Sequence, residues 1–293
     1  MIQIQDVSFE YEKEQGTLSH IDLNIQQGEC VVLTGESGCG KTTVTKLING
    51  LIPHFVEGGT LSGTTIVNGM EVPKTEMYRL AEQVGSVFQN PKSQFFNIDS
   101  DSEITFGLEN AGVEPKKIKE RYEATVSALK IQSLLGRNIF SMSGGEKQSL
   151  AFASVYAMNP SVFVLDEPTA MLDPNGRKDV IRAARALNDV ENVTIILITH
   201  YMEEVIYADR VFVMDEGKVV MQGTPREIFS QVERLKHLRL DVPQVTLLAY
   251  ELQKSGLKLP DGILTAQELT EELKKLCTGS KTGASDNRQM PVK

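Results

Sequence analysis

Apolar and polar residues alternate along the first part of the chain. Apolar side chains recur with period two within residues 2–11, and again at 21–25 after a loop around Gly16. A period-two pattern is typical of β-strands with one covered face. We therefore expect an antiparallel β-layer at the N-terminus.

From residue 30 the pattern changes to short, continuous apolar runs separated by long helical stretches. The runs lie at 30–33, 162–165, 194–198 and 211–214. Such runs suit strands covered on both faces, so they predict a mostly parallel sheet in an α/β fold. The turn at 215–218, followed by the run at 219–222, predicts a hairpin that closes this core.

Residues between about 90 and 160 contain no comparable strand run. Segments 118–129 and 147–158 have helical patterns instead. We interpret this stretch as a helical subdomain inserted into an α/β domain that spans residues 1–230.

A helical appendage is predicted at residues 231–276. Apolar residues at Val245, Leu248, Ala249 and Leu252 have helical spacing, and Gly256 ends the pattern as a C-cap. Thr265 and Glu268 have capping-box spacing for a last helix through Leu276. The polar remainder, 277–293, is predicted to be disordered.

Composition narrows the class of protein. The chain has 293 residues and a formal net charge of −9, which argues against nucleic acid as a partner. It has no apolar stretch long enough to span a membrane and no secretory signal pattern, so we expect neither a spanning nor a secreted protein. The three cysteines, which fit a reducing compartment, show neither disulfide nor zinc spacing.

Residues 35–43, GESGCGKTT, match the phosphate-binding pattern G-x-x-x-x-G-K-[ST] between a buried strand and a helix. The predicted nucleotide-binding residues are Gly35, Glu36, Ser37, Gly38, Cys39, Gly40, Lys41, Thr42 and Thr43. Backbone N–H groups of such a loop and the following helix dipole bind phosphates. Lys41 adds charge at the β- and γ-phosphates, and Thr42 offers a hydroxyl to Mg²⁺. A chance glycine-rich turn is the alternative, and Cys39 needs no redox role.

Two further segments distinguish this chain from other P-loop proteins. Ser143 and the glycines after it open a helix, giving a second N-terminus that can face phosphate. The run VFVLDE at 162–167 is an apolar strand that ends in two carboxylates. Asp166 is placed to hold Mg²⁺, and Glu167 to act as general base toward the attacking water.

With these motifs in this order, residues 1–230 resemble the nucleotide-binding domain of ABC proteins. The resemblance implies a RecA-like core and makes 35–43 Walker A, 143–148 the signature and 162–167 Walker B. It also makes Tyr11 the aromatic residue that stacks on adenine and Gln89 the Q-loop residue. Asp173 then belongs to the D-loop, and His200 is the switch histidine. Gln89 is then a ligand of Mg²⁺, and His200 and Lys41 act with Glu167 in catalysis on the γ-phosphate of ATP.

The same resemblance implies a head-to-tail dimer driven by ATP. The signature residues of one chain, Ser143, Gly144, Gly145 and Glu146, close over ATP held by Walker A of another chain. Some of the implied residues have simpler interpretations. Tyr11 falls on the same strand face as Phe9 and could belong to the core, and Glu167 could cap the next turn.

Three segments resemble the ATPase (A) components of energy-coupling factor (ECF) transporters, which import vitamins and trace metals in prokaryotes. The segments are QNPKSQFF with EITFGLEN, TAMLDPNGR, and DVPQVTLLAYEL. This resemblance implies a second ATPase subunit, a transmembrane T component and substrate-binding S components. It places the chain peripherally on the cytoplasmic face of the membrane. Asp101 and Glu103 are candidates for meeting an arginine of the T component, although both could be ordinary solvated carboxylates.

The signature departs from the common pattern of the family at Met142, Glu146 and Ser149. A carboxylate at Glu146 is compatible with phosphate only if it points away or is hydrogen-bonded. Three other functions stay open. They are a conventional ABC transporter subunit, a soluble ABC ATPase acting on DNA or ribosomes, and a module that binds ATP without hydrolysing it.

Overall fold

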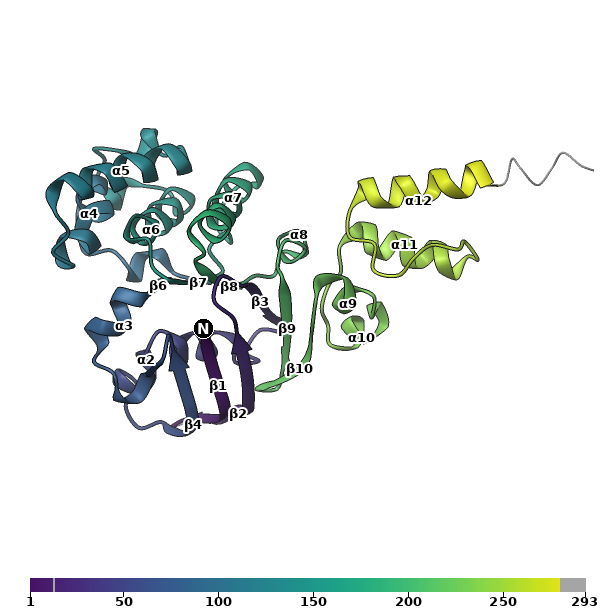
Figure 1. Ribbon diagram of the computed structural model, residues 1–293, viewed down its shortest axis with the longest axis horizontal. Helices are drawn as coiled ribbons and strands as arrows, with labels where there is room; N and C mark the ends of the chain where they lie inside the picture. The colour runs from purple at the N-terminus through teal and green to yellow at the C-terminus, as the bar shows by residue number, and fades with distance from the viewer. Residues whose placement is uncertain (13, 280–293) are drawn as a thin grey trace, which may run out of the picture. The chain divides into compact units, whose positions relative to one another are not determined.

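The computed structural model describes residues 1–12 and 14–279 (Figure 1). The chain divides into two units, Met1–Gln222 and Gly223–Lys293, which are described separately below. Within the described residues, no helix combines the length and the apolar character needed to cross a bilayer.

The first unit begins with an antiparallel sheet in the order β2-β1-β4-β5. Its strands are β1 Ile2–Tyr11, β2 Glu14–Ile25, β4 Thr60–Val67 and β5 Met70–Glu71. The predicted β-layer is therefore present. The register of β1 against β2 shifts between Ile4 and Val7, where the alternation in the sequence also slips, so both residues stay buried.

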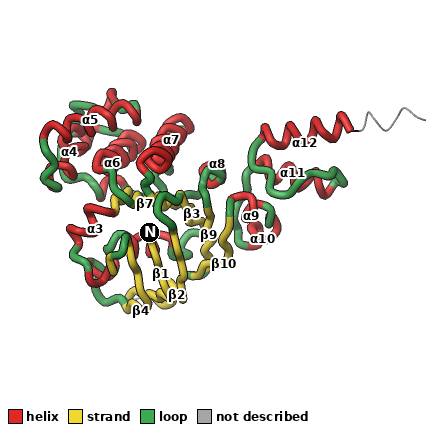
Figure 2. The backbone as a smooth tube through the Cα atoms, viewed as in Figure 1, coloured by secondary structure: helices red, strands yellow, loops and turns green. Residues whose placement is uncertain are grey.

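A second sheet has the order β10-β9-β3-β8-β7-β6, and the strands from β9 to β6 run parallel. Its strands are β3 Cys30–Gly35, β6 Val84–Val87, β7 Val162–Asp166, β8 Thr194–Ile198, β9 Arg210–Asp215 and β10 Lys218–Gly223. The strands are drawn in yellow in Figure 2. Every residue of β3, β7 and β8 is buried, as continuous apolar runs predict.

The helices of the first unit surround these sheets. They are α1 Lys41–Ile48, α2 Leu51–His54, α3 Met77–Gln83, α4 Ser100–Asn110, α5 Pro115–Leu129, α6 Gly144–Met158, α7 Pro174–Glu191 and α8 Met202–Val205. Helices α4 and α5 both pack on α6, forming a helical layer beside the sheets (Figure 1). This layer occupies the stretch predicted to be a helical subdomain.

Helix α1 shares one core with both sheets. Val44 and Leu47 on α1 belong to the same buried cluster as Phe9 of β1 and Leu33 of β3. Because a close-packed core resists displacement, the position of α1 relative to the end of β3 is fixed.

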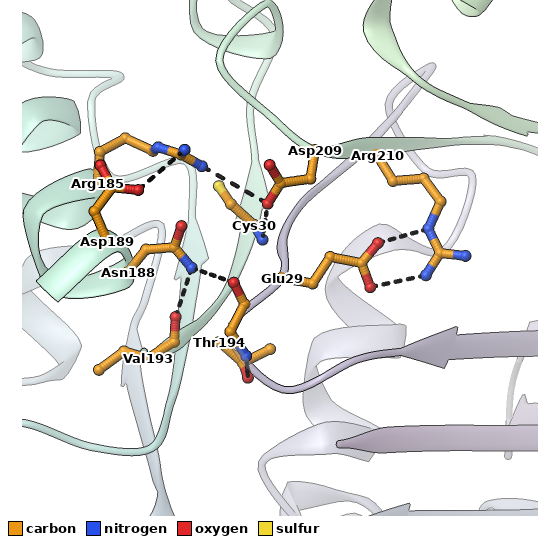
Figure 3. A network of polar contacts seen from close by, with 10 residues as sticks. Glu29, Cys30, Arg185, Asn188, Asp189, Val193, Thr194, Asp209 and Arg210 are labelled. Carbon is orange, nitrogen blue, oxygen red and sulfur yellow. Dashed lines mark hydrogen bonds and ion pairs between the residues drawn. The ribbon is translucent and has the colours of Figure 1, made fainter. Parts of the chain in front are cut away.

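A polar network holds the opposite end of β3 (Figure 3). The backbone N–H of Cys30 donates to Asp209 Oδ2 at 2.7 Å, and Glu29 forms an ion pair with Arg210 at 2.8 Å. Arg185 on α7 lies 3.8 Å from Asp209. Burial raises the pKa of the Cys30 thiol to about 11, so it stays protonated at neutral pH. The network anchors β3 and α7 at the sheet edge away from the phosphate-binding loop.

The second unit contains α9 Pro225–Phe229, α10 Val232–His237, α11 Gln244–Lys254 and α12 Ala266–Gly279. Of the apolar residues predicted to share one face of α11, Val245, Ala249 and Leu252 line a small core with α12, whereas Leu248 is 52% exposed. Gly256 follows α11 with a φ of 96°, the left-handed conformation expected after a helix.

Helix α12 begins with a modified form of the predicted capping box. Thr265 Oγ1 accepts from the N–H of Glu268 at 3.1 Å, but Glu268 Oε2 accepts from Leu264 N rather than from Thr265 N. The helix runs to Gly279, so the first residues of the stretch predicted to be disordered are helical. The rest of that prediction, residues 280–293, lies outside the described residues.

Candidate functional site

The carboxyl ends of four adjacent strands carry most of the predicted site residues. In the order β3-β8-β7-β6, these ends lead into the phosphate-binding loop, His200, the pair Asp166 and Glu167, and Gln89. In open parallel sheets, ligands bind at this edge. The fold therefore gathers segments that are far apart in the sequence.

The loop from β3 into α1 depends on glycine at its two ends. A Cβ on Gly35 would lie 2.2 Å from the carbonyl oxygen of Met214, and one on Gly40 would lie 2.9 Å from that of Thr17. Gly40 also has a φ of 101°, which L-residues rarely adopt. Glycine lets the loop curl tightly before Lys41, the first residue of α1.

Lys41 is 6% exposed, and its ammonium is held by the loop itself. Nζ donates to the carbonyl oxygens of Gly35 at 2.8 Å and Glu36 at 2.9 Å. Both acceptors are neutral, so these contacts orient the charge without cancelling it. Cys39 is also buried, and burial raises the pKa of its thiol although Lys41 opposes the shift. The thiol therefore stays protonated at neutral pH.

Thr42 and Asp166, two of the three predicted metal ligands, are in direct contact. Thr42 Oγ1 donates to Asp166 Oδ2 at 2.8 Å. Asp166 ends β7 and is 5% exposed, and burial raises the pKa of its carboxyl group despite that hydrogen bond. A hydroxyl beside a carboxylate suits Mg²⁺, which prefers oxygen ligands and takes the remainder from phosphates and water. The two residues fit the ion.

Glu167 is held by the two other predicted polar side chains. Gln89 Nε2 donates to Glu167 Oε2 at 3.0 Å, and His200 Nε2 lies 3.0 Å from Glu167 Oε1. Glu167 also has a φ of 49°, an uncommon left-handed conformation for a residue with a side chain. Strained backbone of this kind clusters at active sites. The geometry joins three residues that are separated by 78 and 33 positions in the sequence.

Tyr11 lies at the end of β1 and is half-buried. Phe9 is 2% exposed, and its ring meets the Tyr11 ring edge-on at 4.8 Å. Lys46 Nζ donates to the Tyr11 hydroxyl at 3.2 Å. Phe9 is thus a core residue and Tyr11 is at the rim of the core, and adenine stacking on Tyr11 stays a prediction.

The signature segment forms the N-terminus of α6. Ser143 is the N-cap, and a complete capping box joins it to Glu146. Glu146 Oε2 accepts from Ser143 N at 2.7 Å, and Oε1 accepts from Arg137 Nη1 at 2.5 Å. Arg137 and the capping box lower the pKa of Glu146 to about 2. The carboxylate is therefore hydrogen-bonded, which is one of the two arrangements expected to make a negative charge here compatible with phosphate.

The glycines of the signature lie beside the predicted D-loop. Gly144 is exposed, and a Cβ on Gly145 would lie 3.0 Å from the Met171 carbonyl oxygen. Asp173 is the N-cap of α7 and accepts from the N–H groups of Asn175 and Gly176. In this chain its carboxylate therefore organises its own helix.

The two acidic candidates on α4 both accept hydrogen bonds from within the chain. One oxygen of Asp101 accepts from the Tyr122 hydroxyl and the other from Gly136 N, and a contact between Asp101 and an arginine of the T component stays a prediction. Glu103 is 3% exposed and lines a groove with Phe96. Its Oε2 accepts from the backbone N–H groups of Phe96 and Asn97. No donor among the described residues forms a hydrogen bond with Glu103 Oε1.

Arg137, which neutralises Glu146, was not predicted from the sequence. It stands nine positions before its partner and belongs to no motif. The Glu146 departure itself was the signal, because a carboxylate facing phosphate requires a nearby donor. The strand that precedes Gln89, β6, was also not predicted, because Gly85 and Ser86 interrupt its apolar pattern.

Comparisons with known proteins agree on one family. The ABC transporter family model matches residues 18–170. The chain is 41% identical to the energy-coupling factor transporter ATP-binding protein EcfA1 of Clostridium novyi, over 94% of this chain and 98% of the relative. It is 40% identical to a putative ABC transporter ATP-binding protein of Pyrococcus horikoshii, over 94% of this chain and 96% of the relative.

Solved structures show the same fold. CbiO1 of Clostridium perfringens, part of the ABC transporter complex CbiONQ, matches with a TM-score of 0.69 at 30% identity, covering 84% of this chain and 97% of that one. The ATP-binding cassette MJ0796, a dimer bound to ADP and phosphate, matches with a TM-score of 0.68 at 21% identity, covering 76% and 98%. This second match shows the fold alone. The chain belongs to the ABC transporter family, as one of its energy-coupling factor transporter ATP-binding proteins.

Proposed function

We propose that this chain binds ATP with Mg²⁺ and hydrolyses it to drive uptake through an ECF transporter. One observation carries the proposal: Glu167 lies at the end of a buried strand, between Gln89 and His200 at 3.0 Å each. A carboxylate held from both sides can orient an attacking water, which a residue that only caps a turn need not do.

The proposed chemistry divides among the residues already described. The N–H groups of the loop 35–43 and Lys41 bind the phosphates, and Tyr11 stacks on adenine. Thr42, Asp166 and Gln89 hold Mg²⁺, which when bound neutralises charge on the phosphates. Glu167 accepts a proton from the attacking water, while His200 keeps Glu167 in place and contacts the γ-phosphate.

A second ATPase subunit is required to complete the proposed site. Among the described residues, Ser143 and Glu146 form hydrogen bonds only with partners within residues 137–147, so the N–H group of the exposed Gly144 is left for another chain's nucleotide. Because Arg137 neutralises Glu146, the segment does not repel phosphate. We propose a head-to-tail pair with a copy or a paralogue.

The membrane partner is proposed to bind the groove beside α4. Phe96 is 77% exposed and stacks on Phe106 at 5.1 Å, giving an apolar wall. Glu103 lies in the same lining, and no donor among the described residues forms a hydrogen bond with its Oε1. This arrangement suits an apolar helix of the T component that carries an arginine. The chain would then act peripherally, on the cytoplasmic face of a prokaryotic membrane, with S components selecting the vitamin or trace metal.

Phosphate release by the reconstituted ATPase pair tests the enzyme proposal. Glu167→Gln should lower the rate by about 10²-fold or more, since general-base catalysis contributes 10²–10⁴-fold, and should leave ATP binding intact. Glu82→Gln, a surface substitution, is the control. Equal rates for wild type and Glu167→Gln would reject hydrolysis at this site.

Co-purification from native membranes tests the docking proposal. Phe96→Asp should remove the T and S components from the purified complex, since a charge in an apolar contact is costly, and should leave ATP binding unchanged. Phe55→Asp is a matched control, because Phe55 is 67% exposed and lies outside the groove lining. Full recovery of the membrane components with Phe96→Asp would reject the groove.

A further inference from the structure

A buried carboxylate lies behind the candidate site and takes no part in the roles proposed above. Glu204, on the short helix α8, is 7% exposed. Its Oε1 accepts from Thr169 Oγ1 at 2.8 Å, and its Oε2 accepts from Thr199 Oγ1 at 2.6 Å. Both threonines are 1% exposed. Each carboxylate oxygen is thus committed to a different segment of the chain.

Those two segments contain Glu167 and His200, which are proposed to act in hydrolysis. Thr169 follows Glu167 by two residues after β7, and Thr199 directly precedes His200 after β8. The Thr199 hydroxyl also accepts from Tyr201 N at 3.0 Å, so hydrogen bonds flank His200 on both sides. Glu204 therefore links the chain segments next to Glu167 and His200, whose side chains lie 3.0 Å apart.

The bridge has a charged neighbour on α7. The Arg177 guanidinium lies 4.1 Å from the centre of the Tyr201 ring and attracts Glu204 electrostatically. Arg177 N donates to the carbonyl oxygen of Asp173 in the D-loop. Burial raises the pKa of Glu204, and the two threonines and Arg177 oppose that rise. A buried charge costs free energy that an uncharged packing contact would avoid.

We propose that Glu204 is a positioning residue for ATP hydrolysis. Its carboxylate holds the exits of β7 and β8 together, so that His200 remains within hydrogen-bonding distance of Glu167. Glu204 contacts neither the attacking water nor the phosphates, and its effect passes through the contact between His200 and Glu167. The inference rests on the hydrolysis proposed above.

The first test substitutes Glu204→Gln in the full-length chain, assembled with its partner ATPase. The variant keeps the side-chain size, but its amide nitrogen cannot accept from a threonine. We expect kcat to fall about tenfold, because small misplacements of catalytic groups are costly, with KM and nucleotide Kd unchanged. Glu203→Gln, on the adjacent exposed residue of α8, should keep wild-type values.

A double-mutant cycle then asks whether Glu204 acts through His200. In a His200→Ala background, measured with radiolabelled ATP, Glu204→Gln should cause no further loss, because the group it positions is gone. A second tenfold loss there would show that Glu204 acts elsewhere and would overturn the proposal. So would a parallel rise in KM and nucleotide Kd.

Thr199 gives an independent check if Glu204→Gln does not fold. Thr199→Ser keeps the hydroxyl and should keep kcat within about twofold, whereas Thr199→Val removes it and should lower kcat about tenfold. Equal rates for the two would count against the bridge. Glu167→Gln is measured alongside, because full activity there rejects hydrolysis itself. If Glu167→Gln loses activity while the Glu204 and Thr199 variants keep wild-type kcat, only the positioning role is rejected.

Discussion

Two helix N-termini in this molecule are predicted to meet phosphate, and they carry charge of opposite sign. Lys41 begins α1, and its buried ammonium donates to two neutral carbonyl oxygens. Glu146 lies in the first turn of α6, and its carboxylate is already paired with Arg137. The first charge is oriented but not neutralised, while the second is neutralised within the chain.

The difference shows what each segment requires from a ligand. If phosphate binds the loop 35–43 as proposed, Lys41 gains a charged partner there, and binding energy is concentrated at that loop. If the signature faces a second phosphate as proposed, the Glu146 carboxylate must instead be kept from repelling it, and the ion pair with Arg137 would do this.

Removing the unneutralised charge should have the largest effect. Lys41→Ala is expected to weaken ATP binding about 100-fold, because it removes charge-assisted hydrogen bonds to phosphate. Titration with a fluorescent ATP analogue measures the loss. Lys74→Ala is the matched control, since Lys74 pairs with Glu71 on the surface and should leave affinity unchanged. Wild-type affinity in Lys41→Ala would remove this lysine from the phosphate site.

Exposing the neutralised charge should have a smaller effect. In the proposed pair, Arg137→Ala would leave Glu146 facing the partner's nucleotide without its cation, and we expect ATP-dependent pairing and hydrolysis to fall about tenfold. The double variant Arg137→Ala with Glu146→Gln should recover most of the loss, because no charge then needs compensation. Light scattering and phosphate release measure both steps. A double variant as weak as Arg137→Ala alone would show that Arg137 acts by another route.

The same contrast explains which parts of the site the sequence could predict. The loop 35–43 and the pair Asp166 and Glu167 are continuous motifs placed after apolar strands, so local pattern was sufficient to find them. Arg137 and Glu204 act through side chains brought together by helix packing, and neither belongs to a local pattern. Their partners could be found only in the folded structure.

The fold shows a similar division. Strands with continuous apolar runs, such as β7 and β8, were predicted, whereas β4 and β6 were missed because their exposed or small residues give no clear period. The acidic residues of α4 show why exposure cannot be inferred from charge alone. Asp101 satisfies a tyrosine hydroxyl and a backbone N–H, and Glu103 caps the backbone that leads into its own helix.

The smallest expected effect is on the stability of the nucleotide-free protein, where the two acidic groups should act with opposite sign. Burial raises the pKa of Asp166, so ionising it at pH 7 costs stability, and Asp166→Asn should raise Tm by a few degrees. Arg137 and the capping box lower the pKa of Glu146 from 4.5 to about 2. Its contribution is therefore fully present above pH 4.5 and declines as the pH falls toward 2.

Glu146→Gln should accordingly lower Tm slightly, by an amount that is constant from pH 8 to 5 and shrinks below about pH 4.5. Differential scanning fluorimetry without Mg²⁺ or nucleotide measures both variants in the full chain. Glu109→Gln, an exposed residue of α4, serves as the control for a change of net charge. A fall in Tm for Asp166→Asn, together with a rise for Glu146→Gln, would contradict the prediction. It would mean that the charge of Asp166 stabilises the fold and the charge of Glu146 destabilises it.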